Sequence, residues 1–98
     1  MSGSEVKNPS SLDVTIVNKR GLHARASAKF VQMAETFPDV KITVSKGAET
    51  VGGLSIMGLM LLAAGPGTKV TLAAEGPRAR DALSALKELV DAGFGEEE

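Results

Sequence analysis

Residues 12–44 read LDVTIVNKRGLHARASAKFVQMAETFPDVKITV and contain two kinds of hydrophobic periodicity. Apolar residues alternate with polar ones over 12–16 and again over 40–44, as in strands with one buried face. Between these segments, small and apolar residues recur at three- and four-residue steps from Ser27 to Phe37, as in an amphipathic helix. The stretch therefore predicts a strand, a helix from about Ala24 to Thr36, and a second strand.

The remaining sequence extends this order. A short third strand is predicted near Ala48 to Val51, an apolar helix over 54–62, and a fourth strand in which Val70, Leu72 and Ala74 alternate with polar or small residues. A last helix follows Gly76-Pro77 and carries a clear apolar stripe from Ala79 to Val90. We therefore expect a two-layer α+β open-faced sandwich, with a four-stranded antiparallel sheet covered on one face by three helices in the order βαββαβα.

Composition excludes several classes of function. The chain has 98 residues, enough for one domain, and its 12 acidic and 11 basic residues give a net charge of −1, which argues against nucleic acid as a partner. With no cysteine and one histidine, neither a thiolate nor an imidazole metal site is expected, and no cofactor is implied. The longest apolar stretch, 56–64, is shorter than the about 20 residues of a membrane-spanning helix, so a cytoplasmic protein without membrane insertion is expected.

The two ends of the chain differ from the middle. Residues 1–11 are small, polar and charged, which predicts a disordered leader. Gly93 is expected to stop the last helix and to leave 93–98 as a solvated acidic tail. The predicted domain therefore covers 12–92.

His23 is the candidate for chemistry, because histidine is the side chain type that changes charge near neutral pH. It directly precedes the predicted first helical turn, where backbone N–H groups have no intrahelical partner and can bind an anion. Arg25 and Lys29, one turn apart, and Lys19 and Arg20 in the preceding loop add positive charge. No carboxylate or hydroxyl lies nearby in the sequence to complete a hydrolytic triad. A lone histidine is also commonly a surface or capping residue, and that interpretation stays open on these observations.

Two motifs carry a family resemblance. Gly-Leu-His-Ala-Arg at 21–25 and Ser-Ile-Met-Gly at 55–58 resemble the histidine-containing phosphocarrier family, HPr, of the bacterial phosphoenolpyruvate phosphotransferase system. The resemblance implies that His23 accepts a phosphoryl group from enzyme I and passes it to an enzyme IIA domain. It also implies that Arg25 and the backbone at Ala24 stabilise the phosphoryl oxygens, and that Ser55 is a regulatory site for a serine kinase and phosphorylase. A monomeric phosphoryl-transfer intermediate is expected.

Two residues depart from the family pattern. Ala26 stands where many members have proline, which leaves an N–H group in the first helical turn. Leu54 stands before Ser55 where lysine is common, which removes a charge from the docking face. Sugar uptake and a nitrogen-type regulatory branch both remain open.

The second helix is apolar nearly all round, and a short helix can bury only one face. Leu59 and Leu62 are expected in the core, which leaves Ile56, Met57 and Met60 as an exposed apolar patch for docking partners. The alternative is that all of them are core residues. Ser55 precedes this helix, and without the resemblance it is simply a helix cap.

Two other functions remain as alternatives. The protein could be a regulatory interaction module that binds partners through the second helix, with His23 inert. It could also be a small-molecule-binding α+β domain, although the sequence has no polar pocket signature.

Overall fold

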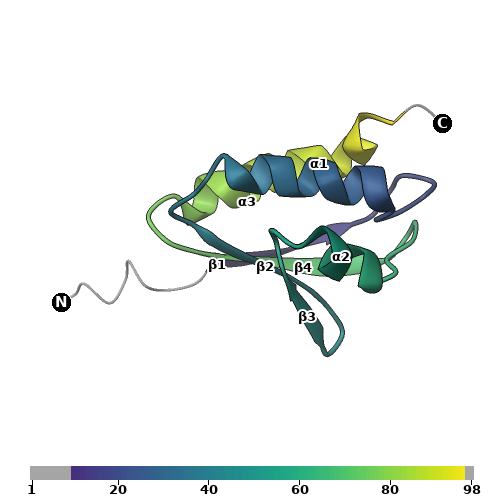
Figure 1. Ribbon diagram of the computed structural model, residues 1–98, viewed down its shortest axis with the longest axis horizontal. Coiled ribbons are helices and arrows are strands. Elements are labelled where there is room, and N and C mark those ends of the chain that lie inside the picture. The colour runs from purple at the N-terminus through teal and green to yellow at the C-terminus, as the bar shows by residue number, and fades with distance from the viewer. Residues whose placement is uncertain (1–9, 97–98) are drawn as a thin grey trace.

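The computed structural model describes residues 10–96; the expectations for 1–9 and for 97–98 lie outside the described residues. The elements along the chain are β1 (Ser10–Thr15), α1 (Ala24–Glu35), β2 (Lys41–Lys46), β3 (Glu49–Gly52), α2 (Ile56–Leu61), β4 (Lys69–Glu75), α3 (Ala79–Asp91) and the short turn η2 (Gly93–Gly95) (Figure 1). The predicted element order is confirmed, with boundaries that differ by a few residues.

The strands form one antiparallel sheet in the order β1-β4-β2-β3. β4 is a central strand, because it pairs with β1 on one side and with β2 on the other. Leu72 of β4 lies opposite Leu12 of β1 and Val44 of β2, so the predicted apolar faces of three strands meet in register.

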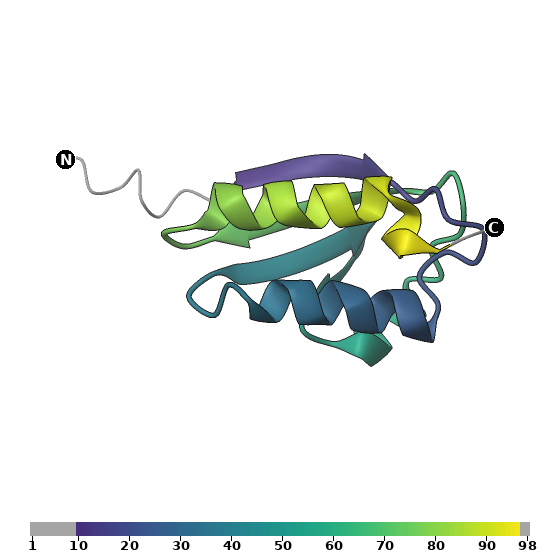
Figure 2. The same cartoon turned by 90° about the horizontal axis from the view of Figure 1, so that it is seen from above.

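One face of the sheet is covered by helices and the other is open. α1 and α3 lie side by side across the covered face, and α2 lies beside α1 near β3 (Figures 1 and 2). The core lies between these layers, where Phe30 of α1, Leu72 of β4 and Leu86 of α3 are at most 2% exposed. The predicted α+β open-faced sandwich is therefore confirmed.

The described structure extends past both expected domain boundaries. β1 begins at Ser10, where it pairs with Ala74, so the last two residues of the expected leader belong to the sheet. At the other end, Phe94 is 1% exposed within the core, so the segment after α3 is not a purely solvated tail. Backbone pairing holds Ser10 and Ser11 in the sheet, and burial of one large side chain holds Phe94, although the neighbouring residues are polar at both ends.

Candidate functional site

His23 caps the N-terminus of α1. Its backbone is extended, with φ −74° and ψ −179°, and its Nδ1 atom accepts a hydrogen bond from the Arg25 N–H at 3.3 Å. The side chain is 17% exposed, so the ring is not fully buried, and the hydrogen bond to Nδ1 shows that it faces the helix terminus. The placement predicted from the sequence, an imidazole beside the unpaired amides of a first helical turn, is present in the structure.

The loop before His23 is fixed by backbone and side-chain contacts. Gly21 has φ +65°, and a Cβ atom there would lie 2.3 Å from the Ala64 carbonyl oxygen, so this position requires glycine. The Leu22 N–H donates to the same oxygen at 3.0 Å. Buried Asn18 donates from Nδ2 to the Gly21 carbonyl at 2.8 Å. These contacts attach the histidine loop to the segment that follows α2.

Glu96 was missed as a site residue. Its Oε2 atom pairs with His23 Nε2, and its Oε1 accepts from Asn18 Nδ2 at 3.0 Å. The hydrogen bond from Asn18 and, after it, the hydrogen bond and the charge of His23 lower the pKa of the Glu96 carboxyl below its usual value. The expectation that the acidic end is only solvated is wrong at this residue, because the turn at η2 brings it back to the β1–α1 loop. A signal was present in the sequence, since Phe94 is a large apolar residue within an otherwise polar tail.

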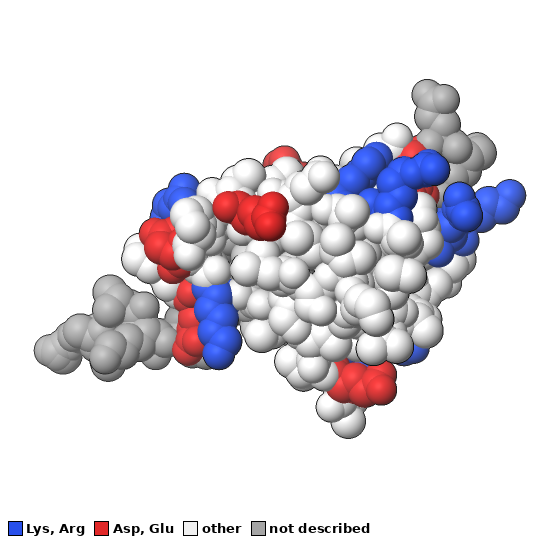
Figure 3. Space-filling view, in the orientation of Figure 1, with Lys and Arg blue, Asp and Glu red and all other residues white. Residues whose placement is uncertain are grey.

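Positive charge gathers at this end of the molecule. Figure 3 shows Lys and Arg side chains clustered where α1 begins, next to a largely uncharged surface. The Arg25 guanidinium is exposed and makes no hydrogen bond or ion pair with any other residue in 10–96. Lys29 has a different role from the one predicted, because its Nζ donates to the Phe94 carbonyl at 2.7 Å. Arg25 is therefore available to an anion, whereas Lys29 holds the chain end.

A surface hollow joins His23 to α2. Its volume is about 280 Å³, and its lining includes Arg20, His23, Met60 and Ala63. The hollow therefore has a cation and an imidazole on one side and an apolar side chain on the other. The structure therefore places His23, the predicted phosphoryl-accepting residue, and Met60, a predicted docking residue, in the same hollow.

The exposed apolar side chains around α2 form a set that we call the α2 surface: Leu54, Ile56, Met57, Met60 and Leu61, which are 39–75% exposed. The predicted exposure of Ile56, Met57 and Met60 is confirmed, as is the burial of Leu59 and Leu62. Leu54 and Leu61 were not predicted to be exposed. Leu61 follows Met57 by about one helical turn, so these two share the outward side of the helix, whereas Leu54 lies in the segment before the helix.

Comparison with known proteins identifies the family. A sequence profile described as "PTS HPr component phosphorylation site" matches residues 10–92. The phosphocarrier protein HPr of Cupriavidus necator is 49% identical over 86 residues, which cover 88% of this chain and 96% of that protein. The chain belongs to the HPr family. Its relatives include the phosphocarrier protein NPr of Shewanella violacea, 45% identical over 83 residues that cover 85% of this chain and 90% of that one.

Solved HPr structures have the same fold. The crystal structure of HPr-C-His from Thermoanaerobacter tengcongensis matches with a TM-score of 0.85 at 43% identity, over 91% of this chain and 99% of that one. An HPr dimer from the same organism matches with a TM-score of 0.70 at 44% identity, over 85% of this chain and 94% of that one. This chain is therefore a phosphocarrier-family protein of the phosphotransferase system.

The two departures from the HPr pattern have different structural settings. Ala26 is fully buried beneath the first turn of α1, so its methyl group packs inward while its backbone stays at the helix terminus. Leu54 is 63% exposed and adds to the α2 surface. In this HPr-family chain the departure at Leu54 therefore enlarges the apolar surface.

Ser55 is the N-cap of α2. Its Oγ atom accepts a hydrogen bond from the Gly58 N–H at 2.9 Å, and the side chain is exposed. The capping interpretation of this residue is therefore confirmed. Its exposure within the α2 surface is also compatible with access by another protein.

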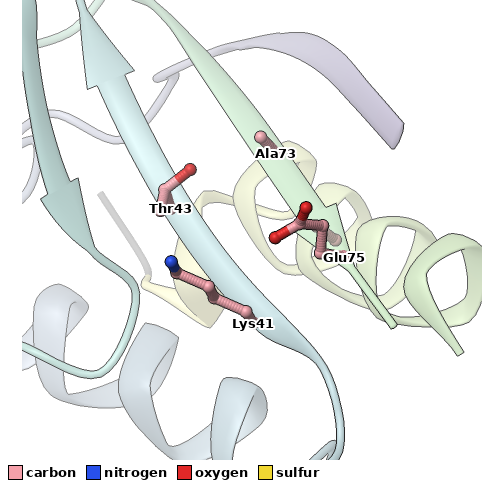
Figure 4. Close-up of a pocket in the computed structure, with 5 residues that line it drawn as sticks. Lys41, Thr43, Ala73 and Glu75 are labelled. Carbon is pink, nitrogen blue, oxygen red and sulfur yellow. The ribbon is translucent and has the colours of Figure 1, made fainter. Parts of the chain in front are cut away.

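The open face of the sheet of this HPr-family chain carries a second hollow. Its volume is about 220 Å³, and Lys41 and Thr43 of β2 face Ala73 and Glu75 of β4 across it (Figure 4). It lies on the uncovered face, away from His23. Within 10–96 no group of three His, Asp or Glu side chains is placed to hold a metal ion, and no helix there has the length and apolarity to span a membrane.

Proposed function

We propose that this protein carries a phosphoryl group on His23 between enzyme I and an enzyme IIA domain of the phosphotransferase system. The observation that carries the proposal is the geometry of the ring: a partly exposed imidazole caps α1, and its Nδ1 atom faces the Arg25 amide. The family membership supports it independently. The protein acts in this proposal as a stoichiometric intermediate rather than as a turnover enzyme.

Nδ1 is the nitrogen that we propose to accept the phosphoryl group. Its lone pair forms the new N–P bond while the bond between phosphorus and the donor breaks and its electron pair leaves with the donor. The Arg25 N–H, which Nδ1 releases in this step, then donates to a phosphoryl oxygen, together with the N–H of Ala24 and the Arg25 guanidinium. The helix dipole favours the added negative charge at this end.

The α2 surface and the neighbouring cations are the proposed docking site. An exposed methionine-rich surface can adapt to more than one partner, which a carrier needs because it meets a donor and an acceptor. The cations at the start of α1 would attract acidic partner surfaces. We propose a cytoplasmic monomer, and the solved HPr dimer makes sedimentation at working concentration the direct check.

The test is transfer of labelled phosphoryl groups. Incubation with enzyme I and radiolabelled phosphoenolpyruvate should give an acid-labile label on wild-type protein and none on His23→Ala. Phosphorus NMR should assign the modification to Nδ1. Equal labelling of the His23→Ala variant, or no labelling of the wild type, would overturn the proposal.

The acceptor separates sugar uptake from nitrogen-type regulation. Labelled protein is mixed in turn with a sugar-type and a nitrogen-type enzyme IIA domain, and the faster acceptor defines the branch. The HPr and NPr relatives support transfer in general, so this comparison decides the finer role.

Ser55 is proposed as a regulatory phosphorylation site for a serine kinase and phosphorylase. A phosphoryl group there adds about −2 charge within the α2 surface while the helix dipole tolerates it. Docking should weaken while the fold is retained. Incubation with such a kinase and mass spectrometry of the Ser55 peptide tests the assignment.

The α2 surface also favours a second candidate, a regulatory module that binds partners without phosphoryl transfer. Met57→Asp and His23→Ala separate the two. For a carrier, Met57→Asp slows transfer and His23→Ala abolishes it. For a binding module, Met57→Asp abolishes a complex and His23→Ala changes nothing. Met57 is 71% exposed, so the fold should tolerate the aspartate.

A further inference from the structure

The chain end after α3 folds back in a defined way. Gly93, Phe94 and Gly95 all have positive φ, at 62°, 58° and 73°. The left-handed conformation is unfavourable for a non-glycine residue, and burial of the Phe94 ring in the core compensates for it. The hydrogen bond from Lys29 Nζ fixes the Phe94 carbonyl as well. The position of Glu96 therefore follows from an anchored turn rather than from a fraying end.

The Glu96 carboxylate is largely buried and has hydrogen-bond partners on both oxygens. Its side chain is 9% exposed, beside a His23 side chain that is 17% exposed. The Asn18 amide that donates to it is itself 1% exposed and also donates to the Gly21 carbonyl. The Asn18 amide cannot be flipped, because both groups that contact Nδ2, the Gly21 carbonyl and the Glu96 carboxylate, are hydrogen-bond acceptors. Asn18 therefore holds Glu96 at a fixed place against the ring.

This placement distinguishes the two nitrogens of His23. A carboxylate accepts a hydrogen bond, so Glu96 requires the proton on Nε2. In the neutral ring, Nδ1 is then unprotonated, which agrees with the hydrogen bond it accepts from Arg25. The low pKa of the Glu96 carboxyl, caused first by Asn18 and then by His23, keeps the carboxylate ionised at neutral pH.

We propose that Glu96 is a positioning residue that selects Nδ1 as the phosphoryl acceptor and balances the charge of the phosphorylated ring; this rests on the proposed function. When Nδ1 forms the N–P bond, Nε2 keeps its proton and the ring becomes positively charged. The Glu96 carboxylate is the counter-ion that faces Nε2. When the N–P bond breaks toward the acceptor, the ring leaves as neutral imidazole. No proton has to enter or leave in either direction.

Glu96 does not occupy the proposed phosphoryl position. The carboxylate contacts Nε2, whereas the helix amide contacts Nδ1, and these nitrogens lie on different sides of the ring. A competing interpretation, in which the acidic end blocks the site, predicts faster transfer when Glu96 is removed. The two interpretations therefore differ in the sign of one measurement.

The experiment compares Glu96→Ala and Glu96→Gln with wild type, and uses Glu88→Gln, an exposed carboxylate on α3, as the matched control. Long-range proton–nitrogen NMR of the unphosphorylated protein reads the tautomer of His23. We expect a single form protonated on Nε2 in the wild type and in the control, and a mixture in Glu96→Ala. Glu96→Gln keeps one acceptor oxygen for the two donors, Asn18 Nδ2 and His23 Nε2, so it should hold the tautomer less completely than the wild type and more completely than Glu96→Ala.

The second measurement is the phosphorylation rate with enzyme I. Loss of one charge-assisted hydrogen bond should slow Glu96→Ala about tenfold, with Glu96→Gln in between. NMR shifts of the Phe94 ring report whether the chain end stays anchored. The role of Glu96 would be overturned if Glu96→Ala transfers the phosphoryl group at the wild-type rate and keeps the wild-type tautomer, or if it transfers faster than wild type. If the wild type itself accepts no phosphoryl group, the proposed function fails, and the tautomer measurement still decides whether Glu96 orients the ring.

Discussion

At the scale of single residues, His23 is set between two different environments. Nδ1 faces a helix terminus that favours negative charge, and Nε2 faces the Glu96 carboxylate. The ring is held by hydrogen bonds at both nitrogens and still reaches solvent. Such an arrangement can accept an anionic group on one nitrogen without losing the contact on the other.

Arg25 gives a prediction at this scale. Its guanidinium is exposed and unpaired within the described chain, so Arg25→Ala should leave the unfolding free energy within about 0.5 kcal/mol of wild type. Phosphoryl transfer should slow about tenfold, because one charge-assisted hydrogen bond to the phosphoryl oxygens is lost. Rapid-quench assays with enzyme I measure the rate, and Arg80→Ala on α3 is the charge-matched control. Equal rates for both variants would remove Arg25 from the site.

At the scale of elements, α2 has two separate functions on its two sides. Leu59 is fully buried and attaches the helix to the core, while the α2 surface faces outward. A helix of six residues has little intrinsic stability, so its packing and its cap decide whether it forms. The Ser55 cap therefore matters for the helix that presents the docking surface.

Ser55 gives the prediction for this element. Ser55→Ala removes the acceptor for the Gly58 N–H and should lower the unfolding free energy by about 1 kcal/mol. Ser55→Asp keeps a capping acceptor, so its stability should stay near wild type, but its charge within the α2 surface should raise the KM of enzyme I for the protein several-fold. Urea unfolding and steady-state transfer assays separate the effects. An unchanged KM for Ser55→Asp would count against Ser55 as a docking switch.

At the scale of the whole molecule, the fold brings distant segments to one end. The β1–α1 loop, the segment after α2 and the chain end after α3 meet around His23. Charge is segregated as well: the net charge is −1, yet cations cluster at this end (Figure 3). A nearly neutral protein can therefore present a locally positive site.

Lowering the pH should reduce the stability that the Glu96 contacts give to the folded protein. The pKa of Glu96 is lowered in the folded protein, so its contribution to stability is complete above the ordinary glutamate pKa and is lost as pH falls through the lowered value. His23 and Lys29 are the titratable groups that face it. Between about pH 6 and about pH 3, wild type should lose more unfolding free energy than Glu96→Gln in urea titrations. Equal losses would mean that the ionised carboxylate adds no stability.

Local periodicity in the sequence determined the element order, the sheet faces and most of the core, because strands and helices bury residues at fixed intervals. The same periodicity predicted that His23 precedes a helix and that Met57 is exposed, because both features depend on residues close by in the sequence. The contact between Glu96 and His23 was decided by tertiary structure alone. These residues are 73 positions apart, and no local pattern records that an anchored Phe94 and a left-handed turn bring them together.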